Sequence, residues 1–360
     1  MPPLLAWLLI IVCQAAGAHS PGLSSAEIIA APEQITVKLT FALQNLEAFA
    51  PMDADLDAEV SDAERDAAKP AIAALLAREF SVKTDQRRLS PAQPGTVNFD
   101  RQNNASVEFS YPSPPYRRLD VESNLLNLLG DGHQQYVTLK NEQGLTLAEK
   151  MLHKTDLGFG FDFTPETPAA APSKHQAFLD FFALGVEHIL TGYDHLLFLF
   201  ALLAVTHSFW PAIKIITFFT IAHSITLACA GLNLIELPSA FVEPFIAATI
   251  VYVGLENIVR GDHPKGRHWL TFCFGLIHGF GFASVLREME IESGGGLLLP
   301  LLSFNLGIES GQIAVAALVL PLIWRLNQKP AISVIFLKIC SLLVSLIGAY
   351  WFLQRTLGFA

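Results

Sequence analysis

The chain has 360 residues, of which 52% are hydrophobic and only 16% are charged, and its mean hydropathy is +0.42. Soluble globular proteins carry about 25% charged residues, so this composition argues against an ordinary cytosolic enzyme. A net charge of −10 and an isoelectric point near 5.5 also argue against a nucleic-acid-binding protein, which would present a basic surface.

The charge is distributed unevenly along the chain. Residues 19–175 contain 22 acidic and 14 basic side chains, for a net charge of −8, whereas residues 176–360 contain 11 and 9, for a net charge of −2. We therefore expect two domains that lie in two different solvents, the second of them a lipid bilayer.

Residues 1–18 are typical of a secretory signal peptide. They carry no charged side chain, an apolar core from Leu4 to Val12, and a stretch of small residues that ends at Ala18, as a signal peptidase requires. The lack of Lys or Arg near the start leaves an uncleaved N-terminal anchor as the alternative.

Residues 19–163 are predicted to form an exported, mainly β domain with one helix. Apolar and polar residues alternate in the segments Ile35–Phe41, Val107–Tyr111 and Tyr136–Leu139, as in the strands of a β-sandwich. Residues 64–80 carry apolar side chains near helical spacing. The Pro/Ala/Thr run within residues 164–175 predicts an extended linker, which places the domain boundary there.

An acidic segment of this domain has the oxygen-bearing side chains of an EF-hand calcium loop. Ala58 stands where such loops place the glycine of their sharp turn, so weak Ca²⁺ binding is expected. The alternative is a helix N-terminus, because a Ser and a Glu three residues apart form a capping box. The candidate calcium ligands are Asp53, Asp55, Asp57, Ser61 and Glu64.

Residues 176–355 are predicted to form an all-α, multi-pass membrane domain. A helix needs about 20 mostly apolar residues to cross a bilayer. A separate interfacial helix at residues 176–185, or a bend of the fifth window near Asn305–Gly307, would raise the count from six to seven. The six windows are residues 182–206, 210–231, 240–259, 268–286, 297–326 and 331–353.

The basic residues between these windows predict the orientation. With the first domain outside, six of them lie in inside segments and two in outside segments, as the positive-inside rule requires. We expect a protein of the bacterial inner membrane with a periplasmic N-terminal domain. The inside residues are Lys214, Arg260, Lys265, Arg267, Arg325 and Lys329, and the outside residues are Arg287 and Arg355.

Imidazole and carboxylate side chains recur inside the predicted spans. A charge at the bilayer centre costs about 2.5–3.5 kcal/mol, so such residues usually face a protein interior and have a task. In the first span Glu187-His188 and Asp194-His195 are seven residues apart, so both pairs should project from one side of one helix. The predicted metal ligands are His188, Asp194, His195, His223, His278 and Glu309, and Glu187, Glu256, Asn257 and Asn305 are predicted to line the path.

Several functions use this set of side chains. Imidazole with carboxylate suits Ni²⁺, Co²⁺, Zn²⁺ or Mn²⁺, and the lack of paired thiolates makes Cu⁺ a poor fit. The alternatives are a proton relay, haem ligation by His223 and His278, a metalloenzyme, and a membrane anchor whose polar groups only hold the bundle together. A metalloenzyme is disfavoured because the sequence contains no His-Glu-x-x-His motif.

The polar motifs of the membrane half resemble those of the HupE/UreJ family. The resemblance covers about residues 178–353 and implies a secondary permease for nickel or cobalt, with the metal ion as substrate and no enzyme activity. One difference is Ile189, which follows His188 where the short permeases of the family carry proline. The motifs are Gly185–Phe198 with His188, Asp194 and His195, Phe219–Leu227 with His223, the pair Glu256-Asn257, and Phe274–Ala283 with His278.

Overall fold

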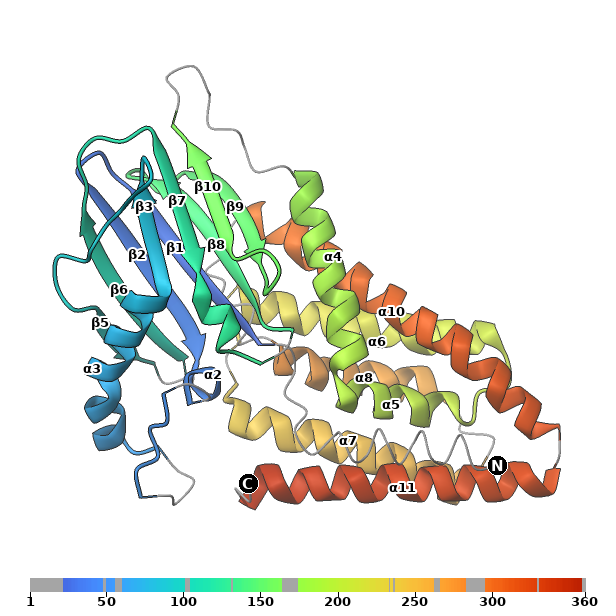
Figure 1. Cartoon of the computed structure of the whole chain (residues 1–360). Coiled ribbons are helices and arrows are strands. Elements are labelled where there is room, and N and C mark those ends of the chain that lie inside the picture. The colour runs from blue at the N-terminus through green and yellow to red at the C-terminus, as the bar shows by residue number, and fades with distance from the viewer. Residues whose placement is uncertain are drawn as a thin grey trace. The chain divides into compact units, whose positions relative to one another are not determined.

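The computed structural model describes residues 22–47, 50–55, 60–100, 104–130, 132–163, 174–232, 234–235, 237–261, 266–282, 295–328 and 330–357. The chain forms two compact units, a β-rich one that includes Pro21–Asp180 and a helical one that begins at Phe181 (Figure 1). The predicted signal peptide, residues 164–173 of the predicted linker, and both Asp57 and Ala58 lie outside the described residues.

Two sheets make up the β-rich unit. The first has the strand order β5-β6-β2-β1-β8-β9 and the second β10-β7-β3-β4. β1 pairs in parallel with β8, and the other pairings are antiparallel. The strands are β1 (Leu23–Ala30), β2 (Gln34–Ala42), β3 (Phe80–Thr84), β4 (Arg87–Arg88), β5 (Thr96–Phe99), β6 (Asn104–Pro112), β7 (Arg118–Ser123), β8 (Gln134–Asn141), β9 (Thr146–Leu152) and β10 (Gly158–Asp162).

The predicted alternation is confirmed in β2 and β6, whereas in β8 residues Gln135–Lys140 are all buried. The three predicted segments lie in β2, β6 and β8. In β2, Val37, Leu39 and Phe41 are fully buried, because alternate side chains of a strand point to the same face. Side chains from both sheets, such as Leu39 and Val121, share one hydrophobic core. The first domain is therefore mainly β, as expected.

The predicted helix is α3 (Asp62–Glu79), which supplies Ile72 and Leu76 to this core. Ser61 caps its start: the Ser61 hydroxyl accepts from the Glu64 amide at 3.3 Å, and Glu64 Oε2 accepts from the Ser61 amide at 2.9 Å. This is the capping box that the spacing predicted. Two short elements were not predicted, the helix α2 (Leu43–Glu47) and the 3₁₀ turn Asn124–Asn127.

Within the described residues, the helical unit has four helices that are long and apolar enough to cross a membrane, or five if a bent pair forms one span. α8 has 15 residues in the described part of the chain and is shorter than a span. The expected six or seven spans are therefore not reached among the described residues. The helices are α4 (Lys174–Thr191), α5 (Tyr193–Leu203), α6 (Phe209–Gly231), α7 (Ser239–Arg260), α8 (Arg267–Gly281), α10 (Gly295–Asn327) and α11 (Pro330–Leu357).

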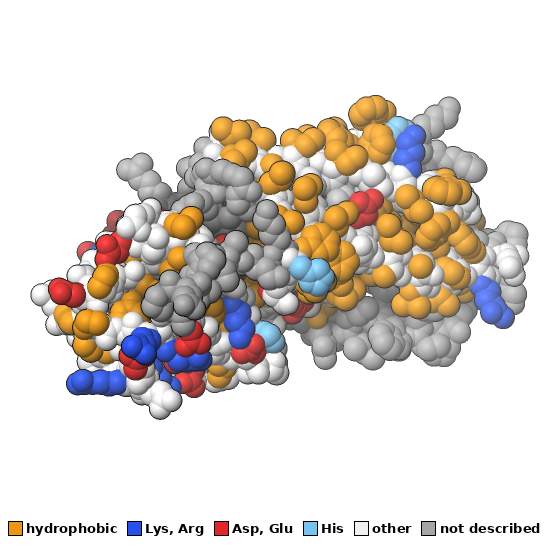
Figure 2. Space-filling view, turned by 90° about the horizontal axis from the view of Figure 1, so that it is seen from above, with side chains coloured by type: hydrophobic (Ala, Val, Ile, Leu, Met, Phe, Trp, Pro, Cys, Tyr) orange, Lys and Arg blue, Asp and Glu red, His pale blue; other side chains and the backbone are white. Residues whose placement is uncertain are grey.

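The surface of this unit is apolar. Figure 2 shows hydrophobic side chains over most of its visible face, whereas charged side chains gather on the β-rich unit. Large apolar residues such as Val259 and Leu318 are 83% and 71% exposed. A soluble protein rarely exposes such contiguous apolar surface, so this unit is covered by lipid.

The helices differ from the predicted windows in their continuity. α10 runs unbroken through Asn305–Gly307, so the alternative of a bend in the fifth window is not found. The first window is instead divided at Gly192, where α4 and α5 meet at 71°. In the last turn of α4 the Thr191 hydroxyl donates to the Glu187 carbonyl at 2.7 Å, a side-chain hydrogen bond back onto its own helix.

Ser61→Ala tests the capping box. Loss of the side-chain acceptor should destabilise the start of α3 by about 1 kcal/mol. This corresponds to about fivefold faster amide hydrogen exchange in its first two turns, measured by mass spectrometry on the full-length protein. Ser61→Thr keeps an acceptor and serves as the control. Equal exchange in Ser61→Ala and wild type would contradict the prediction.

Candidate metal centre

Four buried histidines from four helices meet in the helical unit. They are His188 in the last turn of α4, His195 in the first turn of α5, His223 in α6 and His278 near the end of α8. Each is at most 6% exposed. His195 is central, because its ring centroid lies 4.7, 5.1 and 6.2 Å from those of His188, His278 and His223. We name these four residues the histidine cluster.

The break at Gly192 brings His188 and His195 together. In a continuous helix, seven residues would separate them by about 10 Å along the axis. The expectation that both pairs share one face of one helix is therefore wrong, and a sharp bend replaces that face. A Cβ at Gly192 would lie 2.6 Å from the His188 carbonyl oxygen and 3.0 Å from His195 Nδ1. The bend thus requires glycine.

Glycines also bring His278 to the cluster. A Cβ at Gly275 would lie 2.6 Å from the Phe219 carbonyl oxygen, and one at Gly279 would lie 2.6 Å from that of His223. Two glycines one turn apart therefore let α8 lie directly against the backbone of α6. This contact places the His278 ring 5.3 Å from that of Phe219.

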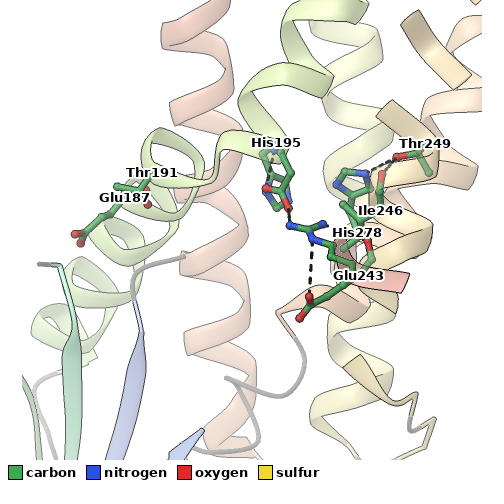
Figure 3. Close-up of polar contacts among 9 residues, drawn as sticks. Glu187, Thr191, His195, Glu243, Ile246, Thr249 and His278 are labelled. Carbon is green, nitrogen blue, oxygen red and sulfur yellow. Dashed lines mark hydrogen bonds and ion pairs between the residues drawn. The ribbon is translucent and has the colours of Figure 1, made fainter. Parts of the chain in front are cut away.

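Hydrogen bonds orient two of the four rings. Asp194 Oδ1 lies 3.0 Å from His195 Nδ1; an ionised carboxylate only accepts, so Nδ1 carries the hydrogen and Nε2 has the lone pair. The Thr249 hydroxyl donates to the Ile246 carbonyl at 2.7 Å and accepts from His278 Nε2 at 2.9 Å (Figure 3). The lone pair of His278 is then on Nδ1. Such outer partners commonly fix the tautomer of metal-binding histidines.

Six ring nitrogens of the cluster are buried without a hydrogen-bond partner in the described part of the chain. Leaving one such atom unsatisfied costs about 1–3 kcal/mol, so their concentration at one place requires an explanation. Neutral imidazole nitrogens with a neighbouring carboxylate are the donors that nickel, cobalt and zinc prefer. The six atoms are Nδ1 and Nε2 of His188, Nδ1 and Nε2 of His223, Nε2 of His195, and Nδ1 of His278.

In this structure the imidazole nitrogens of the histidine cluster are not close enough together to coordinate one metal ion. Among the described residues, three or more candidate ligand atoms lie within 4.8 Å of one another only at Asp53, Asp55 and Glu64. An ion such as Zn²⁺ holds imidazole nitrogens at about 2.0–2.1 Å, so the imidazoles of the histidine cluster would have to rotate inward to coordinate it.

Aromatic rings surround the cluster. Phe282 and Phe304 stack at 4.5 Å and lie 4.6 and 5.5 Å from the His188 ring. Phe219 lies 5.9 Å from the His223 ring and 5.3 Å from that of His278. These rings lower the local dielectric constant, which strengthens any electrostatic contact inside. Phe219 also fills space that a haem between His223 and His278 would need.

Glu256 and Asn257, two of the predicted path residues, lie at the opposite end of α5. Asn257 Nδ2 donates to the Ala201 carbonyl at 2.7 Å, and buried Arg267 reaches the same oxygen at 3.4 Å. Ala201 is in the last turn of α5, where carbonyls lack helical partners. Glu256 pairs with Arg267 at 3.8 Å and with Arg260 at 3.3 Å. These side chains therefore cap a buried helix end.

Three further predicted residues have contacts outside the cluster. Glu309 Oε1 accepts from the Thr217 hydroxyl at 2.7 Å, which ties α10 to α6 six residues before His223. Asn305 Nδ2 donates to the Leu301 carbonyl of its own helix at 2.8 Å. Figure 3 shows the Glu187 side chain pointing away from His195 and His278. Of the predicted metal ligands, the structure thus brings together the four histidines and Asp194.

The candidate calcium loop is described only in part. Asp53, Asp55 and Glu64 each offer an oxygen within 4.8 Å of the other two. Glu64 already accepts from the Ala54 amide at 2.7 Å and from Ser61, and these hydrogen bonds lower the pKa of its carboxyl to about 2. Its main role here is the cap of α3, and Ca²⁺ binding stays a prediction.

Glu256→Gln tests the capping role of the Glu256–Arg267 pair. Arg267 is 6% exposed, and removing the partner of a buried charge typically costs about 3–5 kcal/mol. We expect a clearly lower melting temperature of the purified protein in detergent. Glu309→Gln is the matched control, because a glutamine oxygen can still accept from Thr217. If both variants melt like wild type, Glu256 does not stabilise the end of α5.

Comparison with known proteins agrees with this geometry. The family model for HupE/UreJ proteins matches residues 166–355, which is more than half of the chain. No curated protein sequence matches the chain. The match includes all four members of the histidine cluster and the apolar helices that make this a multi-pass membrane protein. The chain therefore belongs to the HupE/UreJ family.

Proposed function

We propose that the helical unit carries a divalent transition metal ion, nickel or cobalt, across the bacterial inner membrane, with the histidine cluster as its binding site. The observation that carries the proposal is the set of six buried, partnerless imidazole nitrogens beside the Asp194 carboxylate. Family membership supports it, because the HupE/UreJ family suggests a role in metal transport.

The broken helix supports transport rather than permanent storage. Membrane transporters commonly place substrate sites where a helix is interrupted, since free backbone groups and helix ends meet the ion there. Here the interruption at Gly192 lies between His188 and His195. Asp194 occupies the first turn of α5, where the helix dipole stabilises its charge.

Each side chain would contribute a different ligand atom or charge to the site. His195 offers Nε2 and His278 offers Nδ1, because Asp194 and Thr249 occupy their other nitrogens. His188 and His223 form no hydrogen bond through either ring nitrogen within the described ranges, so each can bind through either nitrogen. Asp194 adds a formal negative charge in contact with the cluster, which favours a cation over a neutral substrate.

Two alternative functions fit less well. A proton relay needs hydrogen-bonded neighbours, but six cluster nitrogens have no such partner among the described residues. Haem ligation by His223 and His278 needs space for a macrocycle, and Phe219 packs against both rings. The orientation with the β-rich domain in the periplasm rests on the signal-like N-terminus and on the distribution of basic residues.

His223→Ala and His278→Ala test the metal site. Each should abolish uptake of Ni²⁺ and Co²⁺ into proteoliposomes and reduce bound metal, while costing only about 1–2 kcal/mol of stability. His268→Ala is the matched control, because His268 lies in α8 but contacts Phe218 and Trp269 instead of the cluster. Full uptake by both cluster variants would overturn the proposal. A reduced-minus-oxidised spectrum of wild type checks the haem alternative.

Thr249→Val tests the fixed tautomer of His278. Without the hydroxyl, Nε2 loses its acceptor and the ring can turn, so Co²⁺ affinity should fall about 10- to 100-fold, as for other outer-shell partners. Thr249→Ser retains the hydroxyl and should bind nearly as wild type. Affinity is measured by titration with Co²⁺, whose visible spectrum reports its coordination. Unchanged affinity in Thr249→Val would remove Thr249 from the site.

A further inference from the structure

An arginine links the histidine cluster to a second carboxylate. Arg355, near the end of α11, places Nη2 3.8 Å from Asp194 Oδ2 and Nε 3.9 Å from Glu243 Oε2. Its Nη1 also donates to the Glu243 backbone carbonyl at 3.2 Å. In Figure 3 the Glu243 side chain lies below His195 and His278. One guanidinium therefore stands between two carboxylates from two other helices, at almost equal distances.

The position of this guanidinium matters for a cation at the cluster. Asp194 Oδ1 holds His195 and Oδ2 faces Arg355, so the carboxylate connects the two. A divalent ion bound at His195 would bring its two positive charges close to the positive charge of Arg355. At such separations and in this apolar surrounding, the repulsion is several times stronger than in water. Either Arg355 moves away or the ion binds weakly.

Glu243 supplies the place to which Arg355 can move. Its side chain is 45% exposed, against 18% for Asp194, so it lies farther out of the bundle. Arg355 itself is 23% exposed and packs 5.7 Å from the Trp351 ring on its own helix. A small rotation of the guanidinium would strengthen its pairing with Glu243 and release Asp194 without leaving the arginine uncompensated.

We propose that the Arg355 guanidinium neutralises the Asp194 carboxylate while the site holds no metal ion, and that it pairs with Glu243 instead when the metal ion binds. Arg355 is thus a positioning residue that keeps affinity low enough for release, since a transporter must bind its ion well enough to take it up and weakly enough to let it go. This inference rests on the proposed function. If Arg355 only held α5, α7 and α11 together, its removal would have the opposite effect: the site would loosen and bind the metal ion more weakly.

Arg355→Gln tests the sign of the effect. In Co²⁺ titrations of the full-length protein in detergent, removal of the competing charge should tighten binding about tenfold or more, and slow Co²⁺ release from proteoliposomes. Arg355→Lys keeps the charge and should bind within about threefold of wild type. Lys338→Gln removes an exposed cation from the same helix and should change nothing. Equal or weaker binding in Arg355→Gln overturns the inference.

Glu243→Gln provides a second, opposite test. Without its alternative partner Arg355 stays on Asp194, so Co²⁺ affinity should fall several-fold. In the Arg355→Gln background the same substitution should have no effect, because Glu243 acts through Arg355. Wild-type affinity in Glu243→Gln, or an equal loss in both backgrounds, overturns the inference even if Arg355→Gln fails to fold. If wild type binds no Co²⁺, the proposed function itself fails; if it binds and only these variants disagree, the proposed function stands.

Discussion

At Gly192 the chain ends one helix and starts another at 71° inside an apolar bundle, and every backbone group released there needs a partner. In hydrocarbon no water can supply it, so an unsatisfied carbonyl or amide costs several kcal/mol. The ends of α5 are where polar side chains of five other helices, α4, α6, α7, α8 and α11, converge. Two of the carboxylates predicted to lie on a continuous path, Asp194 and Glu256, lie at opposite ends of α5.

The two ends of α5 use similar residues for different purposes. At the C-terminal end, Asn257 and Arg267 bond to the Ala201 carbonyl, and Glu256 balances the arginine charge. At the N-terminal end, Asp194 bonds to His195 and faces Arg355. Both sets pair a carboxylate with arginine, which limits the cost of burying charge. Buried polar atoms without a hydrogen-bond partner occur in both sets in the described part of the chain, but those beside the N-terminal set are imidazole nitrogens, which is the difference on which the proposed metal site rests.

The openness of the histidine cluster fits the transport of an ion. Ring centroids of His195 and its neighbours lie 4.7 to 6.2 Å apart, but among the described residues no three ligand atoms of the cluster lie within 4.8 Å of one another, so the nitrogens do not yet point at one place. Two of the rings are held in orientation by Asp194 and Thr249, whereas His188 and His223 lack hydrogen bonds that would fix them. A site with two fixed and two adjustable ligands can close on an ion and reopen without rearranging its helices.

The sequence by itself determined the β-rich first domain, the cap of α3, the residue types of the metal centre and the family. These depend on local signals: alternation of side chains in a strand, the Ser61–Glu64 spacing, and motifs within single helices. Tertiary structure alone decided that the first apolar segment breaks, that Glu256 caps α5, and that Glu187 points away from the cluster. The break and the cap depend on packing between helices far apart in the chain. Because most residues of a membrane span are apolar, the sequence of one span does not show which helix packs against it. The place of Arg355 beside Asp194 follows for the same reason, because 161 positions separate them and only the packing of α11 brings them together.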